Sequence, residues 1–135
     1  MVYLDTNVLI YASVEQDRVK KEKSLDLIEK LVKSQKLVLS TLVLQEFVFT
    51  MAKLKIDNAI IKEDSDFYFN FVSVEYDYLT LQKAIESCCS TNYCKNINDV
   101  IHLYLAEKAK CKKLITYDSD FKKLESLSSV AIEIL

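Results

Sequence analysis

The 135-residue chain carries 18 basic and 20 acidic side chains, which gives a formal net charge of -2 at pH 7. Half of its residues are hydrophobic, and no apolar run has the ~20 residues that a membrane helix needs, so we expect one globular domain over residues 1–135, with no membrane segment and a cytoplasmic location. A net charge near zero excludes a protein that is basic over its entire surface, so any contact with nucleic acid must involve a local group of basic residues.

Strand-like and helix-like patterns alternate along the chain. The first half predicts a strand, a helix, a short strand or turn, a second helix and a further short helix, at residues 2–4, 13–34, 36–39, 40–54 and 57–67. The second half predicts a strand, two helices joined by a polar connection, a strand, a short helical turn and a closing strand, at residues 69–74, 77–89, 98–110, 114–117, 118–124 and 130–135.

This alternation predicts an α/β fold, in which a mostly parallel central sheet is flanked by helices on both faces. Ligands of such folds bind beyond the carboxyl ends of the strands. Asp5 follows the first strand directly, and Asp118 follows the strand at 114–117. Two carboxylates from distant parts of the chain are therefore expected at the same edge of the sheet.

Turns and helix ends are poorly marked, because the chain contains no glycine and no proline. Asparagine tolerates the left-handed backbone conformation best among the remaining residues, so we expect asparagines at the turn and cap positions that glycine usually takes. The candidates are Asn58, Asn70, Asn92, Asn96 and Asn98.

The four cysteines do not form a recognisable zinc motif. Cys88, Cys89, Cys94 and Cys111 include no CxxC pair, and adjacent cysteines seldom bind one metal ion together. We interpret them as free, buried or half-buried thiols.

Two further acids stand in apolar helices, where an unpaired carboxylate is costly. Glu46 lies in LVLQEFVF, and Asp99 lies near the start of INDVIHLYLA. Each has a structural alternative, since Glu46 could pair with Lys53, and both Asp99 and Asp118 could cap the helical segments that they open. The residues alone leave these alternatives open.

Several carboxylates at one sheet edge repel one another unless a cation lies among them, so the pattern predicts a metal site. Oxygen ligands favour hard ions, which makes Mg²⁺ or Mn²⁺ the expected cofactor. Asn7 and Thr116 are placed to support the site, although both could instead cap strand ends. His102 is expected to be a packed, hydrogen-bonded residue, with metal ligand or base as the alternative.

The segments LDTNVLI, ST-x3-QEF and INDVIHLYLAEKAKCKKLITYDSDF, in this order, strongly resemble the PIN-domain ribonucleases, and among them the VapC-type toxins of prokaryotic toxin–antitoxin pairs. The resemblance implies a metal-dependent endoribonuclease with Asp5, Glu46, Asp99 and Asp118 as the catalytic acids. It implies that Asp5, Asp99 and Asp118 bind metal, with Asp120 as a further candidate ligand. It also implies a small VapB-like antitoxin as partner, and a homodimer.

Two other functions remain alternatives. A receiver-like phospho-signalling domain shares the alternating architecture and an acidic Mg²⁺ pocket, and a non-catalytic PIN-like module could use the acidic groove for binding alone. The candidates for RNA backbone contact are lysines, which could equally be solvated surface: Lys53, Lys55, Lys112 and Lys113.

Overall fold

The computed structural model describes all 135 residues and contains one parallel sheet, with the strand order β3-β2-β1-β4-β5. The strands are β1 (Val2–Leu4), β2 (Leu37–Ser40), β3 (Val72–Val74), β4 (Lys113–Thr116) and β5 (Ala131–Ile134). Tyr3 of β1 lies opposite Val38 of β2 and Leu114 of β4. The expected α/β fold is therefore confirmed.

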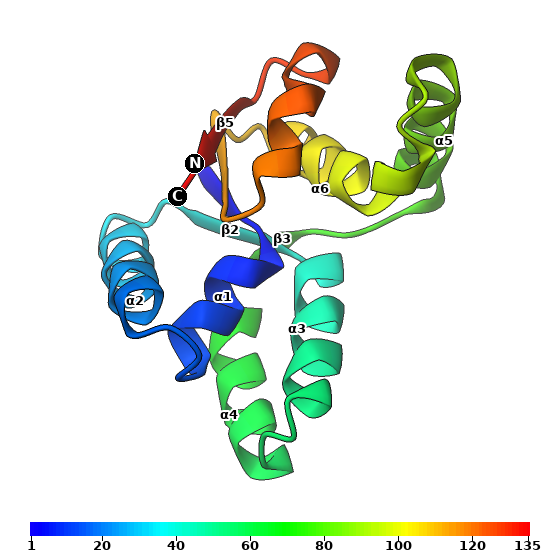
Figure 1. The fold of residues 1–135 in the computed structure, drawn as a ribbon. Coiled ribbons are helices and arrows are strands. Elements are labelled where there is room, and N and C mark those ends of the chain that lie inside the picture. The colour runs from blue at the N-terminus through cyan, green and yellow to red at the C-terminus, as the bar shows by residue number, and fades with distance from the viewer.

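Helices cover both faces of this sheet, with α1 and α2 on one side and α5 and α6 on the other, while α3 and α4 form an antiparallel pair that extends away from it (Figure 1). Their bounds are α1 (Thr6–Ser13), α2 (Arg18–Lys33), α3 (Thr41–Lys53), α4 (Asn58–Phe69), α5 (Tyr78–Thr91) and α6 (Ile97–Lys108), with the 3₁₀ segments η1 (Cys94–Asn96) and η2 (Ser119–Leu127). None of the helices is both long and apolar enough to span a lipid bilayer.

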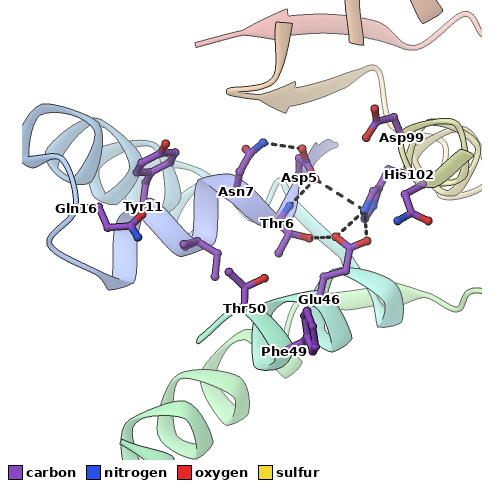
Figure 2. A pocket seen from close by; sticks show the side chains of 12 residues that line it. Asp5, Thr6, Asn7, Tyr11, Gln16, Glu46, Phe49, Thr50, Asp99 and His102 are labelled. Atoms are coloured by element: carbon purple, nitrogen blue, oxygen red, sulfur yellow. Dashed lines mark hydrogen bonds and ion pairs between the residues drawn. The ribbon is translucent and has the colours of Figure 1, made fainter. Parts of the chain in front are cut away.

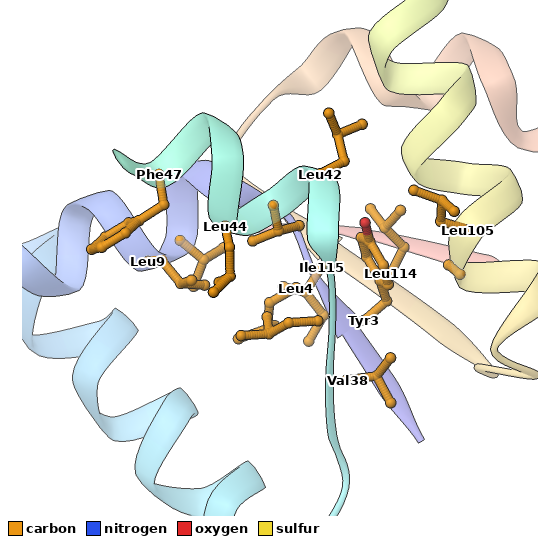
Figure 3. Close-up of a cluster of buried hydrophobic side chains, with 14 of the residues drawn as sticks. Tyr3, Leu4, Leu9, Val38, Leu42, Leu44, Phe47, Leu105, Leu114 and Ile115 are labelled. Atoms are coloured by element: carbon orange, nitrogen blue, oxygen red, sulfur yellow. The ribbon is translucent and has the colours of Figure 1, made fainter. Parts of the chain in front are cut away.

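The hydrophobic core lies between the central strands and the helices. Leu4 and Leu114 on adjacent strands are fully buried, as expected for parallel strands that are covered on both faces. Leu9 of α1, Phe47 of α3 and Leu105 of α6 belong to the same buried cluster (Figure 3). The helices that carry Glu46 and Asp99 are thus anchored to the strand that precedes Asp5.

Two predicted elements differ from the structure. The region predicted as one helix over 13–34 contains the end of α1 and the whole of α2, and α1 already begins at Thr6, directly after the Asp5 cap. The apolar run VLIY looks like a continuing strand, but the Asp5 side chain accepts a hydrogen bond from the Thr6 amide and starts a helix there. The strand predicted over 69–74 is shorter, because α4 continues to Phe69.

Four residues adopt the left-handed conformation at helix ends, and only one of them is an asparagine. Asn92 has a φ of 62° and ends α5, whereas Asn58, Asn70, Asn96 and Asn98 do not have positive φ. The other three are Gln35, Lys55 and Lys110. Each of these three lies two residues beyond a helix. Its backbone amide and that of the following residue donate hydrogen bonds to carbonyl oxygens in the last turn of that helix. The expectation of asparagine at turn and cap positions is therefore confirmed for Asn70, Asn92 and Asn96, which cap helices, but three of the four left-handed positions hold Gln or Lys instead.

Candidate active site

Asp5 lies at the carboxyl end of β1 and is only 7% exposed. Its carboxylate accepts hydrogen bonds from the Thr6 amide at 2.7 Å, from Asn7 Nδ2 at 2.9 Å and from Thr116 Oγ1 at 2.7 Å. Burial raises the pKa of Asp5, although the neighbouring His102 and the Thr116 hydroxyl act in the opposite direction. Asp5 is therefore held rigidly in a position where its negative charge is incompletely balanced.

Asn7 and Thr116 fix this orientation from two sides. Asn7 Nδ2 also contacts Thr116 Oγ1 at 3.0 Å, and Asn7 Oδ1 accepts a hydrogen bond from the Tyr117 amide at 3.1 Å. Thr116 Oγ1 in turn accepts the amide of Asp118 at 3.0 Å. These contacts tie the end of β1 to the end of β4. The chain continues from β1 to β2 and from β4 to β5, towards opposite edges of the sheet, so the two strand ends flank the point at which the strand order reverses.

Glu46 comes from the second turn of α3 and reaches the same region, with 29% of its side chain exposed. It makes no ion pair with Lys53; instead, Thr6 Oγ1 donates to Glu46 Oε2 at 2.7 Å, and His102 Nε2 lies 3.0 and 3.1 Å from its two oxygens. Burial alone would raise the pKa of Glu46, but these hydrogen bonds and the His102 ring lower it below its ordinary value. Glu46 is therefore an ionised acceptor.

Asp99 projects from the first turn of α6 towards the same space (Figure 2). Its only hydrogen-bond partner is Asn96, whose Nδ2 lies 3.4 Å from Asp99 Oδ2. Burial and the nearby charges of Asp5 and Asp118 raise the pKa of Asp99 to about 6. Among the four predicted catalytic acids, Asp99 thus has the weakest hydrogen-bond stabilisation of its negative charge by the protein.

Asp118 and Asp120 lie at the start of η2 and do not line the pocket that the other three acids share. Asp118 caps this segment, because its Oδ1 accepts the amide of Asp120 at 2.9 Å. Its charge still acts on Asp99, whereas Asp120 is exposed. The structure therefore brings Asp118 near the cluster and leaves Asp120 at the surface.

The pocket between these elements has a volume of about 430 Å³. Its lining contains three carboxylates and no lysine or arginine: Asp5, Thr6, Asn7, Ile10, Tyr11, Gln16, Glu46, Phe49, Thr50, Asn98, Asp99 and His102. Ligand atoms of Asp5, Glu46 and His102 lie within 4.8 Å of one another. His102 is the only side chain in this lining that can carry a positive charge, and it faces Asp5 and Glu46 but makes no hydrogen bond to Asp99, so the donor set fits a divalent cation bound mainly by oxygen.

Sequence reasoning did not identify Tyr3, Thr6 or Tyr11, which contribute to the site or its support. Of these three residues, only Thr6 could have been proposed from the sequence, because it follows Asp5 directly. His102 fulfils the main expectation for it, being 2% exposed and hydrogen bonded through both ring nitrogens. The four cysteines are free thiols; Cys88 and Cys111 are buried as expected, whereas Cys89 and Cys94 are exposed, contrary to the expectation of buried or half-buried thiols.

Solved structures similar in fold to this chain include VapBC2 and VapC20. A chain in the crystal structure of VapBC2 from Rickettsia felis, bound to a DNA fragment from their promoter, has a TM-score of 0.72 and 17% identity, with 100% of this chain and 99% of that chain covered. VapC20 from Mycobacterium tuberculosis, a sarcin–ricin loop cleaving toxin, has a TM-score of 0.70 and 14% identity, covering 92% of this chain and 95% of that one.

The structural likeness establishes a shared fold, and a comparison of the sequence with curated proteins gives no match. The model of the PIN domain, however, matches residues 2–127, which include all the elements that carry the pocket. The chain therefore belongs to the PIN domain family.

Proposed function

We propose that the protein is a divalent-metal-dependent endoribonuclease that acts in the cytoplasm as the toxin of a VapBC-type pair. The observation that carries this proposal is the convergence of Asp5, Glu46 and Asp99 on one pocket that contains no lysine or arginine. Membership of the PIN domain family and the fold shared with VapC20 and VapBC2 support it.

In this proposal Asp5 and Asp99 would hold the metal ion, and Asp118 would support it directly or through water. Asp118 is preferred over Asp120 because its charge acts on Asp99 and Asp120 is exposed. The oxygen donors favour Mg²⁺ or Mn²⁺. Such an ion lowers the pKa of a water molecule and neutralises charge that builds on the phosphate oxygens.

Glu46 has a separate role, because its carboxylate is held by Thr6 and His102, whereas Asp99 bonds only to Asn96. As an ionised acceptor it orients the attacking water and receives a hydrogen bond from it. Asn7 and Thr116 keep Asp5 in place during the reaction, since both donate to its Oδ2 atom. The resemblance to PIN-domain nucleases implies products with 5′-phosphate and 3′-hydroxyl ends.

RNA contact is assigned to cations beside the pocket. Lys20 Nζ lies 4.6 Å from the centre of the Tyr11 ring, and Lys53 Nζ lies 5.6 Å from that of Phe49; both rings line the pocket. Lys112 and Lys113, by contrast, stand at the amino end of β4, and Lys113 pairs with Glu133. The RNA backbone therefore passes Lys20 and Lys53, at the carboxyl edge of the sheet.

A small VapB-like antitoxin is the proposed protein partner, since VapBC2 is one of the similar structures. We further propose a homodimer, which sedimentation of the purified chain measures directly. A receiver-like domain is not favoured, because such folds have the strand order 2-1-3-4-5 whereas this sheet has the order 3-2-1-4-5.

The test is cleavage of an RNA with an exposed loop by the purified chain in Mn²⁺ or Mg²⁺. We expect cleavage that a chelator abolishes and that falls by at least about 100-fold in Asp5→Asn and Asp99→Asn. Asp26→Asn, which changes an exposed aspartate on α2, serves as the control. Equal cleavage by the wild type and both site variants would refute the mechanism and favour a non-catalytic binding module.

A further inference from the structure

Beneath the pocket lies a buried polar network that the acid cluster alone does not explain. Tyr3 Oη lies 2.7 Å from Ser40 Oγ and 2.8 Å from His102 Nδ1, and His102 Nε2 reaches the Glu46 carboxylate at 3.0 Å. Tyr3 and Ser40 are fully buried, and His102 is 2% exposed. Polar side chains at this depth are costly unless each is paired, and here each is paired.

The network joins the three elements that carry the pocket acids. Tyr3 lies on β1, two residues before Asp5, and His102 lies on α6, one turn after Asp99. Ser40 caps α3, the helix of Glu46, because its Oγ accepts the Val43 amide at 3.2 Å. A displacement of any one element would break two of the three contacts Tyr3–Ser40, Tyr3–His102 and His102–Glu46.

The contact between His102 and Glu46 has a defined direction. A carboxylate ion only accepts hydrogen bonds, so the Nε2–H group of His102 donates to Glu46. Tyr3 occupies the other ring nitrogen. With both nitrogens engaged by protein groups, the ring is held at a fixed angle beneath the Glu46 carboxylate.

We propose that His102, anchored by Tyr3, is a positioning residue that fixes the orientation of the Glu46 carboxylate towards the reacting water. This inference rests on the proposed ribonuclease function and adds a residue to it. His102 acts through Glu46 and does not bind the metal ion, because its Nε2 atom is committed to that carboxylate.

Two substitutions of His102 test the roles of its two ring nitrogens separately. The Nε2 atom of glutamine can take the place of histidine Nε2, so His102→Gln retains a donor to Glu46 and loses the contact with Tyr3. The amide of asparagine reaches only the position of Nδ1, so His102→Asn retains a group near Tyr3 and loses the donor. The two variants therefore distinguish positioning of Glu46 from a role in core packing, which both would disturb.

We expect kcat for RNA cleavage to fall about 10- to 100-fold in His102→Asn, with KM changed less than about threefold, and to stay within about threefold of wild type in His102→Gln. Tyr104→Phe is the control, because Tyr104 lies on the same helix, is 4% exposed and bonds to Ser87 away from the pocket. It should leave kcat unchanged. An equal loss of kcat in the Gln and Asn variants would overturn the proposal.

A second measurement does not depend on activity. His102 is the only histidine, so the ring signals in a ¹H–¹⁵N NMR spectrum of the metal-free protein belong to it alone. We expect an Nε2–H proton protected from solvent exchange in the wild type and in Tyr104→Phe, and lost in Glu46→Ala. Absence of this proton from the wild type would overturn the proposal. If the proton is present but no RNA is cut, the ribonuclease assignment fails while the His102–Glu46 contact stands.

Discussion

Replacement of Asp99 by asparagine should stabilise the metal-free protein at neutral pH. Burial, together with the charges of Asp5 and Asp118, raises the pKa of Asp99 from 3.8 to about 6. A carboxyl group whose pKa is higher in the folded state binds more protons there than in the unfolded chain between these two values, so the free energy of unfolding decreases as the pH rises through this window. The ionised form is thus a cost to folding at pH 7.5, and asparagine removes that cost.

The size of the effect follows from the same shift. A change in pKa from 3.8 to about 6 corresponds to about 3 kcal/mol if converted in full, and solvent screening of this part-exposed group reduces it to about 1–2 kcal/mol. For a domain of this length, that is an increase in melting temperature of about 3–6 °C. At pH 4.5 the difference should fall to about one third, because Asp99 is then mostly protonated in the folded state.

The assay is thermal unfolding in a chelator at pH 7.5 and 4.5, with Asp26→Asn as the matched control. Addition of Mn²⁺ should reverse the order at pH 7.5, since an ion that binds the folded state stabilises the wild type more than the variant. An Asp99→Asn protein that is less stable than the wild type without metal, or a difference that does not change with pH, would refute the reasoning. Asp5 is unsuitable for this test, because its carboxylate also caps α1 and accepts two side-chain hydrogen bonds.

Three further predictions concern the RNA path, the helix ends and the thiols. The double variant Lys20→Ala/Lys53→Ala should raise KM for RNA about tenfold, whereas Lys112→Ala should leave it unchanged; equal effects would contradict the proposed path. Lys110→Gly should raise the free energy of unfolding in urea by about 0.5–1 kcal/mol, because Lys110 has a φ of 57°, while Lys30→Gly inside α2 should lower it by about 1 kcal/mol; a loss in both would be inconsistent with strain at Lys110. Iodoacetamide should modify the exposed Cys89 and Cys94 in the native protein but reach the buried Cys88 and Cys111 only after unfolding, as peptide mass spectrometry would show; early labelling of Cys111 would contradict its burial.

Much of the fold follows from local sequence patterns. The central strands are short runs of Val, Leu and Ile, and buried parallel strands have this composition. Helix α1 was not predicted, since its apolar residues directly continue those of β1 and only the Asp5 side chain separates the two elements. Of the four left-handed residues only Asn92 was among the candidates, because a helix end fixed by its backbone hydrogen bonds accepts Lys or Gln at a modest cost.

The site was predictable to the extent that it depends on topology. Parallel strands end at one edge, so Asp5 and Asp118 had to lie near each other, and the apolar faces of α3 and α6 point Glu46 and Asp99 to the same region. The network through Tyr3, Ser40 and His102 could not be predicted, because it depends on how side chains of three distant segments meet inside the core.

Anomalous diffraction from crystals grown with Mn²⁺ shows whether Asp5 and Asp99 share a divalent ion. We expect an anomalous peak about 2.0–2.4 Å from a carboxylate oxygen of each residue, and the loss of this peak in Asp99→Asn. A wild-type crystal saturated with Mn²⁺ that shows no peak between these two carboxylates, or a peak only elsewhere, would contradict this expectation.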